Sequence, residues 1–315
     1  MFNDDRWKML DFPQLFRTKE YVSRGITRHG LYHSDRYRQV LPGVRMDLEC
    51  CDRRPVPVWA DNDWRWDAQR LRAALLLYPG VVASHAMAAR LYGWPLPSNW
   101  LTDQLHVSVR NANSRIRLRQ ITLHRAKQMS TREWFGLPIL SPEDVFIGLG
   151  GDLLTRDLIK LGDAAVGKWH GSPQIGLDDL RASVRDRPFV RGRRHLIEAL
   201  DMVRLTVDSP PETDLRLWAI AVGLPEPVVH PQIYSRMLGR VVEPDLGYPD
   251  ALLALEYEGE HHLRSKRQWQ SDINRDEALR AEGWTVLRVT SSINYAQLET
   301  TIRRHLGLEA PRRRA

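Results

Sequence analysis

Residues 241–262 carry the stretch VVEPDLGYPDALLALEYEGEHH. Two apolar runs flank the Gly-, Pro- and Asp-containing segment 247–250, and this pattern predicts a β-hairpin. Each run nevertheless carries acid, with Asp245 in the first and Glu256 and Glu258 in the second. Because side chains alternate between the two faces of a strand, Glu256 and Glu258 share one face. The sequence therefore predicts an acidic patch within a sheet.

If the two strands of the hairpin pair so that Asp245 lies on the same face of the sheet as Glu256 and Glu258, the three acids converge. Carboxylates that crowd together raise one another's pKa, and a divalent cation relieves the repulsion. Hard oxygen ligands favour Mg²⁺ or Mn²⁺ over zinc. The alternative is a solvent-exposed strand face on which polar side chains alternate outward, as in any half-exposed hairpin. The strand pattern by itself leaves both interpretations open.

The surrounding segments predict an α/β domain with a mixed sheet. A helix is expected over 209–223, with Ser209 as its N-cap and an apolar stripe at helical spacing. After the hairpin come a helix over 265–283, a strand over 284–290 and a last helix over 295–306. This order of elements is typical of an α/β fold.

This part of the chain resembles a known superfamily of nucleases. The stretch EPDLGYPDALLALEYEGEHH, followed by DINRDEALRAEGWTVLRVT, resembles the PD-(D/E)XK nucleases, and more narrowly the branch related to very-short-patch-repair endonucleases. The second stretch matches the signature R-D-x-x-L-x-x-x-G-W-x-V-L-x-V of that branch. The resemblance covers about the last third of the chain. It implies a restriction-endonuclease-like domain that hydrolyses phosphodiester bonds with Mg²⁺ or Mn²⁺.

The resemblance also implies roles for particular residues. Asp245 and Glu256 would ligate the metal ion. Glu258 stands where the superfamily most often has lysine, so it would be a further metal ligand or a general base. His262 matches a histidine of this branch and would transfer a proton. The absence of the lysine leaves catalytic activity open.

Two residues on the neighbouring helices have two interpretations each. Glu212 matches a glutamate that completes the acidic cluster in the superfamily, and it also forms a capping box with Ser209. Arg275 lies between Asp272 and Asp276 on the predicted helix 265–283. It would contact the scissile phosphate or pair with a neighbouring acid.

The first part of the chain, 12–48, predicts a winged helix-turn-helix. Thr18 would begin a helix that ends at Gly25, and Thr27 would cap a second one, before a strand–turn–strand segment. In this arrangement the second helix enters the major groove of DNA. The residues it would present are Arg28, His29, Tyr32 and His33, with Arg36 and Arg38 beside them. A helical packing unit with a solvated basic face explains the same pattern.

The middle of the chain predicts an α+β region. Helices are expected over 65–80, over 84–93 and from Ser141, and strands over 105–110 and 115–125. Along the second strand, one face would carry three arginines that contact phosphates or simply face solvent: Arg115, Arg117 and Arg119. The basic stretch RDRPFVRGRRH, 185–195, would be a linker or a loop that faces DNA.

This front part also resembles a family of regulators. The short stretches LPGV, SHAMAARLYGW, LHVSVR and SPEDVFIGLGG resemble the antitoxin-type regulators of abortive-infection type IV systems. The resemblance implies DNA binding, often autoregulatory, and a partner toxin. It does not imply catalysis.

Composition limits the remaining possibilities. The 315 residues carry a net charge of +7, which suits an anionic partner, and 43% are hydrophobic. The two cysteines are adjacent, so they form neither a disulfide framework nor a zinc site. The first residues lack the apolar core of a secretory signal, and no apolar run is long enough to span a bilayer. We therefore expect a cytoplasmic protein without membrane contact.

The sequence predicts three regions and two alternative functions. The regions are 1–60 (winged-helix-like), 61–205 (antitoxin-like α+β) and 206–315 (restriction-endonuclease-like mixed sheet). One function is a metal-dependent DNA endonuclease that the winged helix delivers to double-stranded DNA. The alternative is a non-catalytic, antitoxin-like DNA-binding regulator with a retired nuclease fold.

Overall fold

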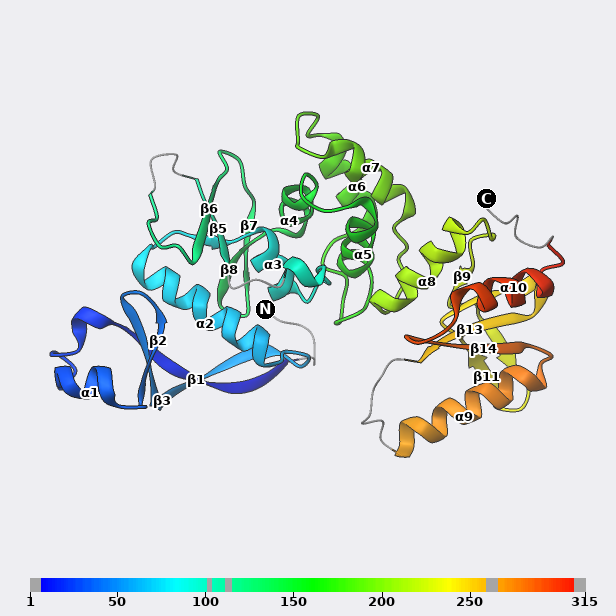
Figure 1. Cartoon of the computed structure of the whole chain (residues 1–315), viewed down its shortest axis with the longest axis horizontal. Coiled ribbons are helices and arrows are strands. Elements are labelled where there is room, and N and C mark those ends of the chain that lie inside the picture. Colours follow the sequence, from blue (N-terminus) through cyan, green and yellow to red (C-terminus); the bar gives the residue numbers. More distant parts are fainter. Residues whose placement is uncertain (1–6, 101–103, 111–114, 259–265, 309–315) are drawn as a thin grey trace. The chain divides into compact units, whose positions relative to one another are not determined.

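The computed structural model describes residues 7–100, 104–110, 115–258 and 266–308, and for 266–273 it describes the backbone alone. The chain divides into two compact units, Met1–Val203 and Arg204–Ala315 (Figure 1). Both regions that the sequence separates at residue 60 lie in the first unit. The mixed α/β class is confirmed.

The first unit begins with a three-stranded antiparallel sheet in the order β1-β3-β2. Its strands are β1 (Trp7–Arg17), β2 (Tyr37–Leu41) and β3 (Val44–Pro57). Two helices accompany this sheet, α1 (Arg28–His33) and α2 (Asn62–Leu77). Phe12 and Phe16 of β1 are buried, so the sheet has an apolar core of its own.

The expected helix-turn-helix does not match this arrangement. The helix predicted from Thr18 to Gly25 is a single 3-10 turn, η1 (Thr18–Glu20), and α1 is a short helix that Thr27 caps by accepting a hydrogen bond from the amide of Gly30. Strand β1 was not predicted, because its pairing shifts between Pro13 and Gln14 and this shift interrupts the alternation. The winged helix is therefore not confirmed.

A five-stranded mixed sheet forms the rest of the first unit, in the order β6-β5-β4-β8-β7. Its strands are β4 (Val82–Ala83), β5 (Leu105–Val109), β6 (Ile121–Arg125), β7 (Thr131–Trp134) and β8 (Leu137–Leu140). The remaining helices are α3 (His85–Tyr92), η2 (Ser98–Trp100), α4 (Pro142–Leu149), α5 (Thr155–Val166), α6 (Leu177–Arg185) and α7 (Arg193–Met202). Helix α3 ends, as predicted, at Gly93, whose φ of 77° favours glycine.

Two basic segments differ from their predictions. The strand expected from Arg115 begins at Ile121, and the three arginines lie in the irregular segment before it, where all are exposed. The segment 185–195 lies within the first unit between α6 and α7, although Phe189 is 98% exposed. Arg187 pairs with Asp144, and Gly192 approaches the backbone of Gly150 so closely that a Cβ would overlap it. This segment is not a linker.

The second unit is built around a four-stranded sheet in the order β14-β13-β12-β9, in which β13 and β14 are parallel and the other pairs antiparallel. Strands β10 and β11 form a separate hairpin. The strands are β9 (Val228–Val229), β10 (Ile233–Ser235), β11 (Arg240–Val242), β12 (Leu246–Tyr248), β13 (Leu253–Glu258) and β14 (Thr285–Thr290). The helices are α8 (Pro210–Ala221), η3 (Pro249–Ala251), α9 (Lys266–Ala281) and α10 (Tyr295–His305).

Helices cover both faces of this sheet. On one face, Leu253 and Leu255 pack against Leu215 of α8 and Ile302 of α10. On the other face, Ala254 packs against α9 through a smaller apolar cluster. Among the described residues, none of the helices has the length and the apolar character needed to cross a membrane.

Candidate metal centre

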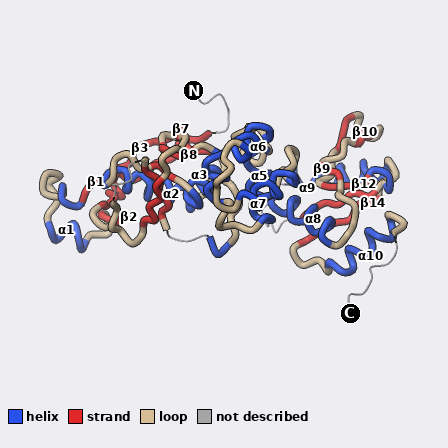
Figure 2. Tube along the Cα trace, turned by 90° about the horizontal axis from the view of Figure 1, so that it is seen from above, coloured by secondary structure: helices blue, strands red, loops and turns tan. Residues whose placement is uncertain are grey.

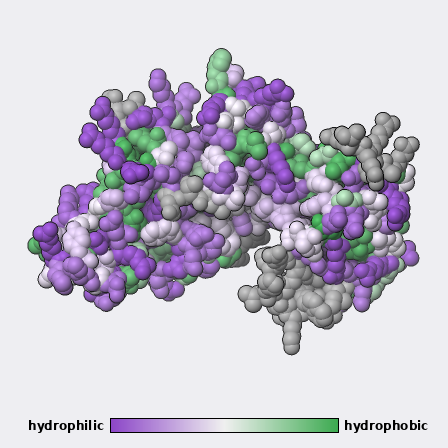
Figure 3. Space-filling view, viewed as in Figure 1, coloured by the Kyte–Doolittle hydropathy of each residue, from purple (hydrophilic) through white to green (hydrophobic). Residues whose placement is uncertain are grey.

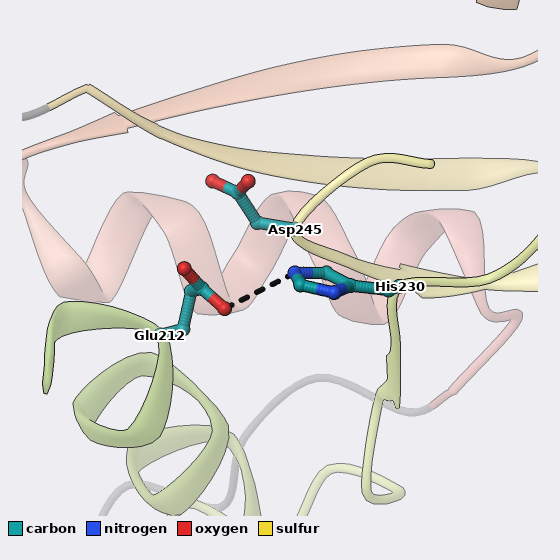
Figure 4. A group of neighbouring side chains, drawn as sticks. All are labelled: Glu212, His230 and Asp245. Carbon is teal, nitrogen blue, oxygen red and sulfur yellow. Dashed lines mark ion pairs between the residues drawn. The ribbon is translucent and has the colours of Figure 1, made fainter. Parts of the chain in front are cut away.

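Three potential metal ligands meet at one end of the second unit: Glu212, His230 and Asp245. One ligand atom from each lies within 4.8 Å of the others (Figure 4). Glu212 lies in the first turn of α8, His230 follows β9, and Asp245 precedes β12. The fold therefore brings together residues from three separate segments.

Glu212 is held by the turn that begins α8. The hydroxyl of Ser209 donates a hydrogen bond to its Oε1 over 2.6 Å, and the amide of Asp208 donates to its Oε2 over 3.0 Å. The same Oε2 lies 3.2 Å from Nε2 of His230. Glu212 therefore faces the cluster, but the predicted capping box is not formed. Glu212 accepts from the amide of Asp208 rather than from that of Ser209, and the Ser209 hydroxyl donates to Glu212 instead of accepting from the helix.

His230 has a backbone conformation that few residues other than glycine adopt, with φ at 45°. Its amide donates to the carbonyl oxygen of Asp245 over 3.1 Å, and its Nδ1 lies 3.7 Å from a carboxylate oxygen of Asp208. The hydrogen bond with Glu212 raises the pKa of His230 against the opposing effect of burial. His230 was not among the site residues predicted from the sequence.

Asp245 is fixed from the opposite strand. The amide of Tyr257 donates to its Oδ2 over 2.7 Å. Burial raises the pKa of the Asp245 carboxyl group, and the charge of Glu212 adds to the increase, although the bond from Tyr257 opposes it. The sequence predicted that Asp245 would be crowded by other carboxylates. In this cluster the neighbouring carboxylate is that of Glu212.

Glu256, the other predicted metal ligand, lies next to this cluster, but its side chain pairs with Arg275. Leu246 pairs with Leu255 and Gly247 with Ala254, so the next position along the hairpin sets Asp245 opposite Glu256. The Glu256 side chain is buried, and its Oε2 accepts a hydrogen bond from Arg275 over 2.7 Å. Arg275 therefore pairs with an acid, which was one of its two predicted roles.

Glu258 lies further along β13, on the same face as Glu256. Its carboxylate pairs with Arg288 of β14, and Arg288 also pairs with Asp276 of α9. The two acids, with the hydrogen bond to Asp276 contributing most, raise the pKa of Arg288. Glu258 does not belong to the cluster of Glu212, His230 and Asp245. His261 and His262 lie outside the described residues, as does the side chain of Asp272.

The predicted DNA-binding residues of the first unit divide into exposed and internally paired ones. Arg28, His29, Tyr32 and Arg38 are exposed. Arg36 instead binds two acids, with 2.7 Å between its Nε and Oδ1 of Asp47 and 2.6 Å between its Nη1 and Oε2 of Glu49. Arg36 is therefore a structural residue of the three-stranded sheet. His33 stacks on His29, with 4.5 Å between the ring centroids.

A second group of histidines lies in the first unit, and the sequence analysis did not predict it. The ring of His124 in β6 stacks on His85 of α3, with 3.5 Å between centroids. Its Nε2 lies 3.1 Å from Nδ1 of His106 in β5. Burial lowers the pKa of His85 to about 3 and that of His124 to about 4, and it also lowers the pKa of His106. No local pattern indicates this group, because its members come from two strands and the start of a helix that are distant in sequence.

Comparisons with known proteins give little further information. No family model matches the chain, and no curated protein matches it. A solved structure of the RV2827C protein from Mycobacterium tuberculosis is similar at 14% identity, with a TM-score of 0.41, over 73% of this chain and 86% of that one. A similarity of this extent does not bear on the site.

Proposed function

We propose that the second unit is a metal-dependent endonuclease domain that hydrolyses phosphodiester bonds in DNA. The observation that carries the proposal is the convergence of Glu212, His230 and Asp245, whose ligand atoms lie within 4.8 Å of one another. The order of the predicted acids along the hairpin and the resemblance to PD-(D/E)XK nucleases support it. The substrate class is what this resemblance implies, and the net charge of +7 of the whole chain suits an anionic partner.

The residues at the centre fit a divalent cation. Carboxylate oxygens and a histidine nitrogen are ligands of first-row divalent metals. Glu212 is buried and Asp245 half-buried, and each is oriented by a hydrogen bond from a backbone amide, as second-layer contacts orient metal ligands. A bound divalent cation would bind a phosphate oxygen and lower the pKa of a water molecule. The imidazole of His230 favours Mn²⁺ over Mg²⁺, because Mg²⁺ prefers oxygen ligands.

Two neighbouring arginines, Arg275 and Arg288, would help to bind the substrate. Arg275 and Arg288 extend from α9 and β14 towards the acidic face of β13, where Glu256 and Glu258 hold them. A guanidinium group fixed in this way is suited to bind phosphate oxygens. Arg288 in particular provides a positive charge next to Glu258, at the place where the superfamily usually has lysine. We expect His262 to transfer a proton.

The test is a plasmid-cleavage assay with Mg²⁺ and with Mn²⁺. The wild-type protein is expected to cleave, faster with Mn²⁺, and Asp245→Ala to lose activity by about 10²-fold or more. Glu243→Ala is the matched control, because this exposed acid lies two positions before Asp245 and outside the cluster. Equal cleavage by the two variants, or none by the wild type with either metal, would contradict the proposal.

One observation favours the second candidate function, a DNA-binding regulator with a retired nuclease site. The ion pair between Arg275 and Glu256 engages a residue that an active site of the resembled family would use for metal. A regulator would bind a duplex specifically without cleaving it, and its affinity would not change with Asp245→Ala. Binding and cleavage measured on the same preparation distinguish the two functions.

A further inference from the structure

The hairpin formed by β10 and β11 has one packed face and one apolar exposed face. Ile233 pairs with Val242, and both are buried in the cluster that contains α9. The next pair, Tyr234 and Val241, faces the opposite side, where the residues are 60% and 43% exposed. Met237 in the connecting turn is 53% exposed. Figure 2 shows β10 at the outer edge of the second unit.

The exposed charges of this hairpin are positive. Residues 231–242 contain Arg236 and Arg240 and no acid. The Arg236 side chain is 89% exposed, and its Nε lies 4.0 Å from Glu282, so its guanidinium group reaches into solvent. The backbone beneath it is fixed, because the amide of Arg236 donates to Glu282 over 2.7 Å. The hairpin thus presents Tyr234 on its exposed face and Arg236 and Met237 in its turn, whereas Arg240, which pairs with Ser235, extends from the opposite face.

The hairpin begins and ends at the candidate metal centre. His230 precedes β10 and Asp245 follows β11, and a backbone hydrogen bond of 3.1 Å joins these two residues. At about 3.3 Å per residue, the turn around Met237 lies up to roughly 20 Å from this base. This length is comparable to the width of a DNA duplex. A duplex with one phosphate at the centre would therefore pass within reach of the hairpin.

We propose that residues 233–242 form an arm that binds double-stranded DNA. This inference rests on the proposed function, because it requires a phosphate of the duplex at the centre. Arg236 and Arg240 would bind backbone phosphates, and Tyr234 and Met237 would contact sugars and bases in the minor groove. We name these four residues the arm residues.

Charge complementarity favours DNA over a second copy of the chain as the occupant. The arm residues of two copies would bring four arginines together, and like charges repel. On the face seen in Figure 3, hydrophobic side chains lie in small groups among hydrophilic ones. A nucleic acid matches the mixture of cations and small apolar surface.

The first experiment measures the contribution of the two arginines. A fluorescent duplex is titrated with the full-length protein at several salt concentrations, with Ca²⁺ in place of Mg²⁺ to prevent cleavage. Arg236→Ala with Arg240→Ala is expected to reduce the slope of log affinity against log salt by about 1.8, since each phosphate contact contributes about 0.9. Arg280→Ala with Arg304→Ala removes the same charge from other exposed positions of the second unit and should leave the slope nearly unchanged.

The second experiment measures the apolar contacts. Tyr234→Ser with Met237→Ser is expected to weaken duplex binding roughly tenfold without changing the salt slope. Leu205→Ser is the matched control, because Leu205 is 54% exposed in the same unit. Binding like that of the parent by both arm variants would overturn the proposal. A dimer of the wild type that separates in the Tyr234 and Met237 variant would also overturn it.

The measurements distinguish an error in the arm proposal from an error in the proposed function. Each arm variant should retain the Mn²⁺-dependent increase in melting temperature of the parent, because the arm residues are not metal ligands. If the wild type shows no cleavage and no metal response but the arm variants still lose affinity, the endonuclease is wrong, and the arm binds DNA without a phosphate held at the centre. If cleavage is present and the arm variants bind normally, the arm is wrong.

Discussion

Nε2 of His230 lies 3.2 Å from Oε2 of Glu212, which joins a residue that follows a short edge strand to the first turn of a helix. Asp245 completes the group. Because of this contact, the group offers an imidazole nitrogen as well as carboxylate oxygens. Without metal, a protonated His230 offsets part of the repulsion between the two acids, and this proton must leave before the imidazole nitrogen could ligate a metal ion.

Metal binding should stabilise the second unit. If a divalent cation binds the native state only, saturation at 100 times the dissociation constant adds about 2.7 kcal/mol to the free energy of unfolding. We expect Mn²⁺ to raise the melting temperature of the wild type in a concentration-dependent way. Asp245→Asn should remove most of this increase. Scanning calorimetry with and without Mn²⁺ measures both effects.

The control for this prediction is Glu243→Gln, which neutralises an exposed acid near Asp245. It should respond to Mn²⁺ like the wild type. Without metal, Asp245→Asn should be slightly more stable than the wild type, because burial and Glu212 both disfavour its charged form. Equal and small metal responses of all three proteins would indicate a solvated acidic face and no metal site.

The histidine group of the first unit should make this unit sensitive to acid. Its members have pKa values below the ordinary value of 6.5 in the folded protein, about 3 for His85 and about 4 for His124. The folded state therefore binds fewer protons than the unfolded state, and stability is fully present above about pH 6.5 and falls as the pH decreases below it. For His85, we expect a decrease of about 2 kcal/mol in the free energy of unfolding at pH 5.

Calorimetry between pH 7.5 and pH 5 measures this dependence. His124→Gln should flatten the pH dependence of the first unit's transition, because it removes one of the groups that must stay neutral. His195→Gln is the control, since His195 is exposed on α7. A transition that does not change between pH 7.5 and pH 5 would mean that the group is hydrated and free to take up protons.

The basic residues at the start of the chain should separate into two classes. Arg28→Ala and Arg38→Ala remove exposed cations, so they should weaken DNA binding and leave the melting temperature unchanged. Arg36→Ala breaks the ion pairs with Asp47 and Glu49, so it should lower the melting temperature of the first unit by several degrees. Melting curves and a salt-dependent binding assay on the three variants test this separation. Identical effects of all three would contradict it.

The second unit should fold by itself. The chain divides between Val203 and Arg204, and the second unit contains two apolar clusters, one on each face of its sheet. We expect a fragment of residues 204–315 to show a cooperative thermal transition and to retain the response to Mn²⁺. An aggregated fragment, or one without a transition, would show that its core requires residues of the first unit.

Local features of both units followed from the sequence. The helix that begins after Ser209 and the alternation along Leu253–Glu258 were predicted, because capping and strand periodicity depend on residues close together in the chain. Gly93 was identified as a helix end for the same reason, since glycine accommodates its positive φ. Asp245 was selected because an acid in an apolar run is conspicuous.

Only the tertiary structure decided the composition of the candidate metal centre. Nothing in the local sequence marks His230 as a ligand, and it meets Asp245 because β9 and β12 pair in the sheet, with Glu212 of α8 beside them. Glu256 was expected in the centre, but Arg275 of α9 binds it. The physical reason is that a strand's sequence determines which residues share a face, whereas the packing of helices and strands distant in sequence determines which charges meet on that face.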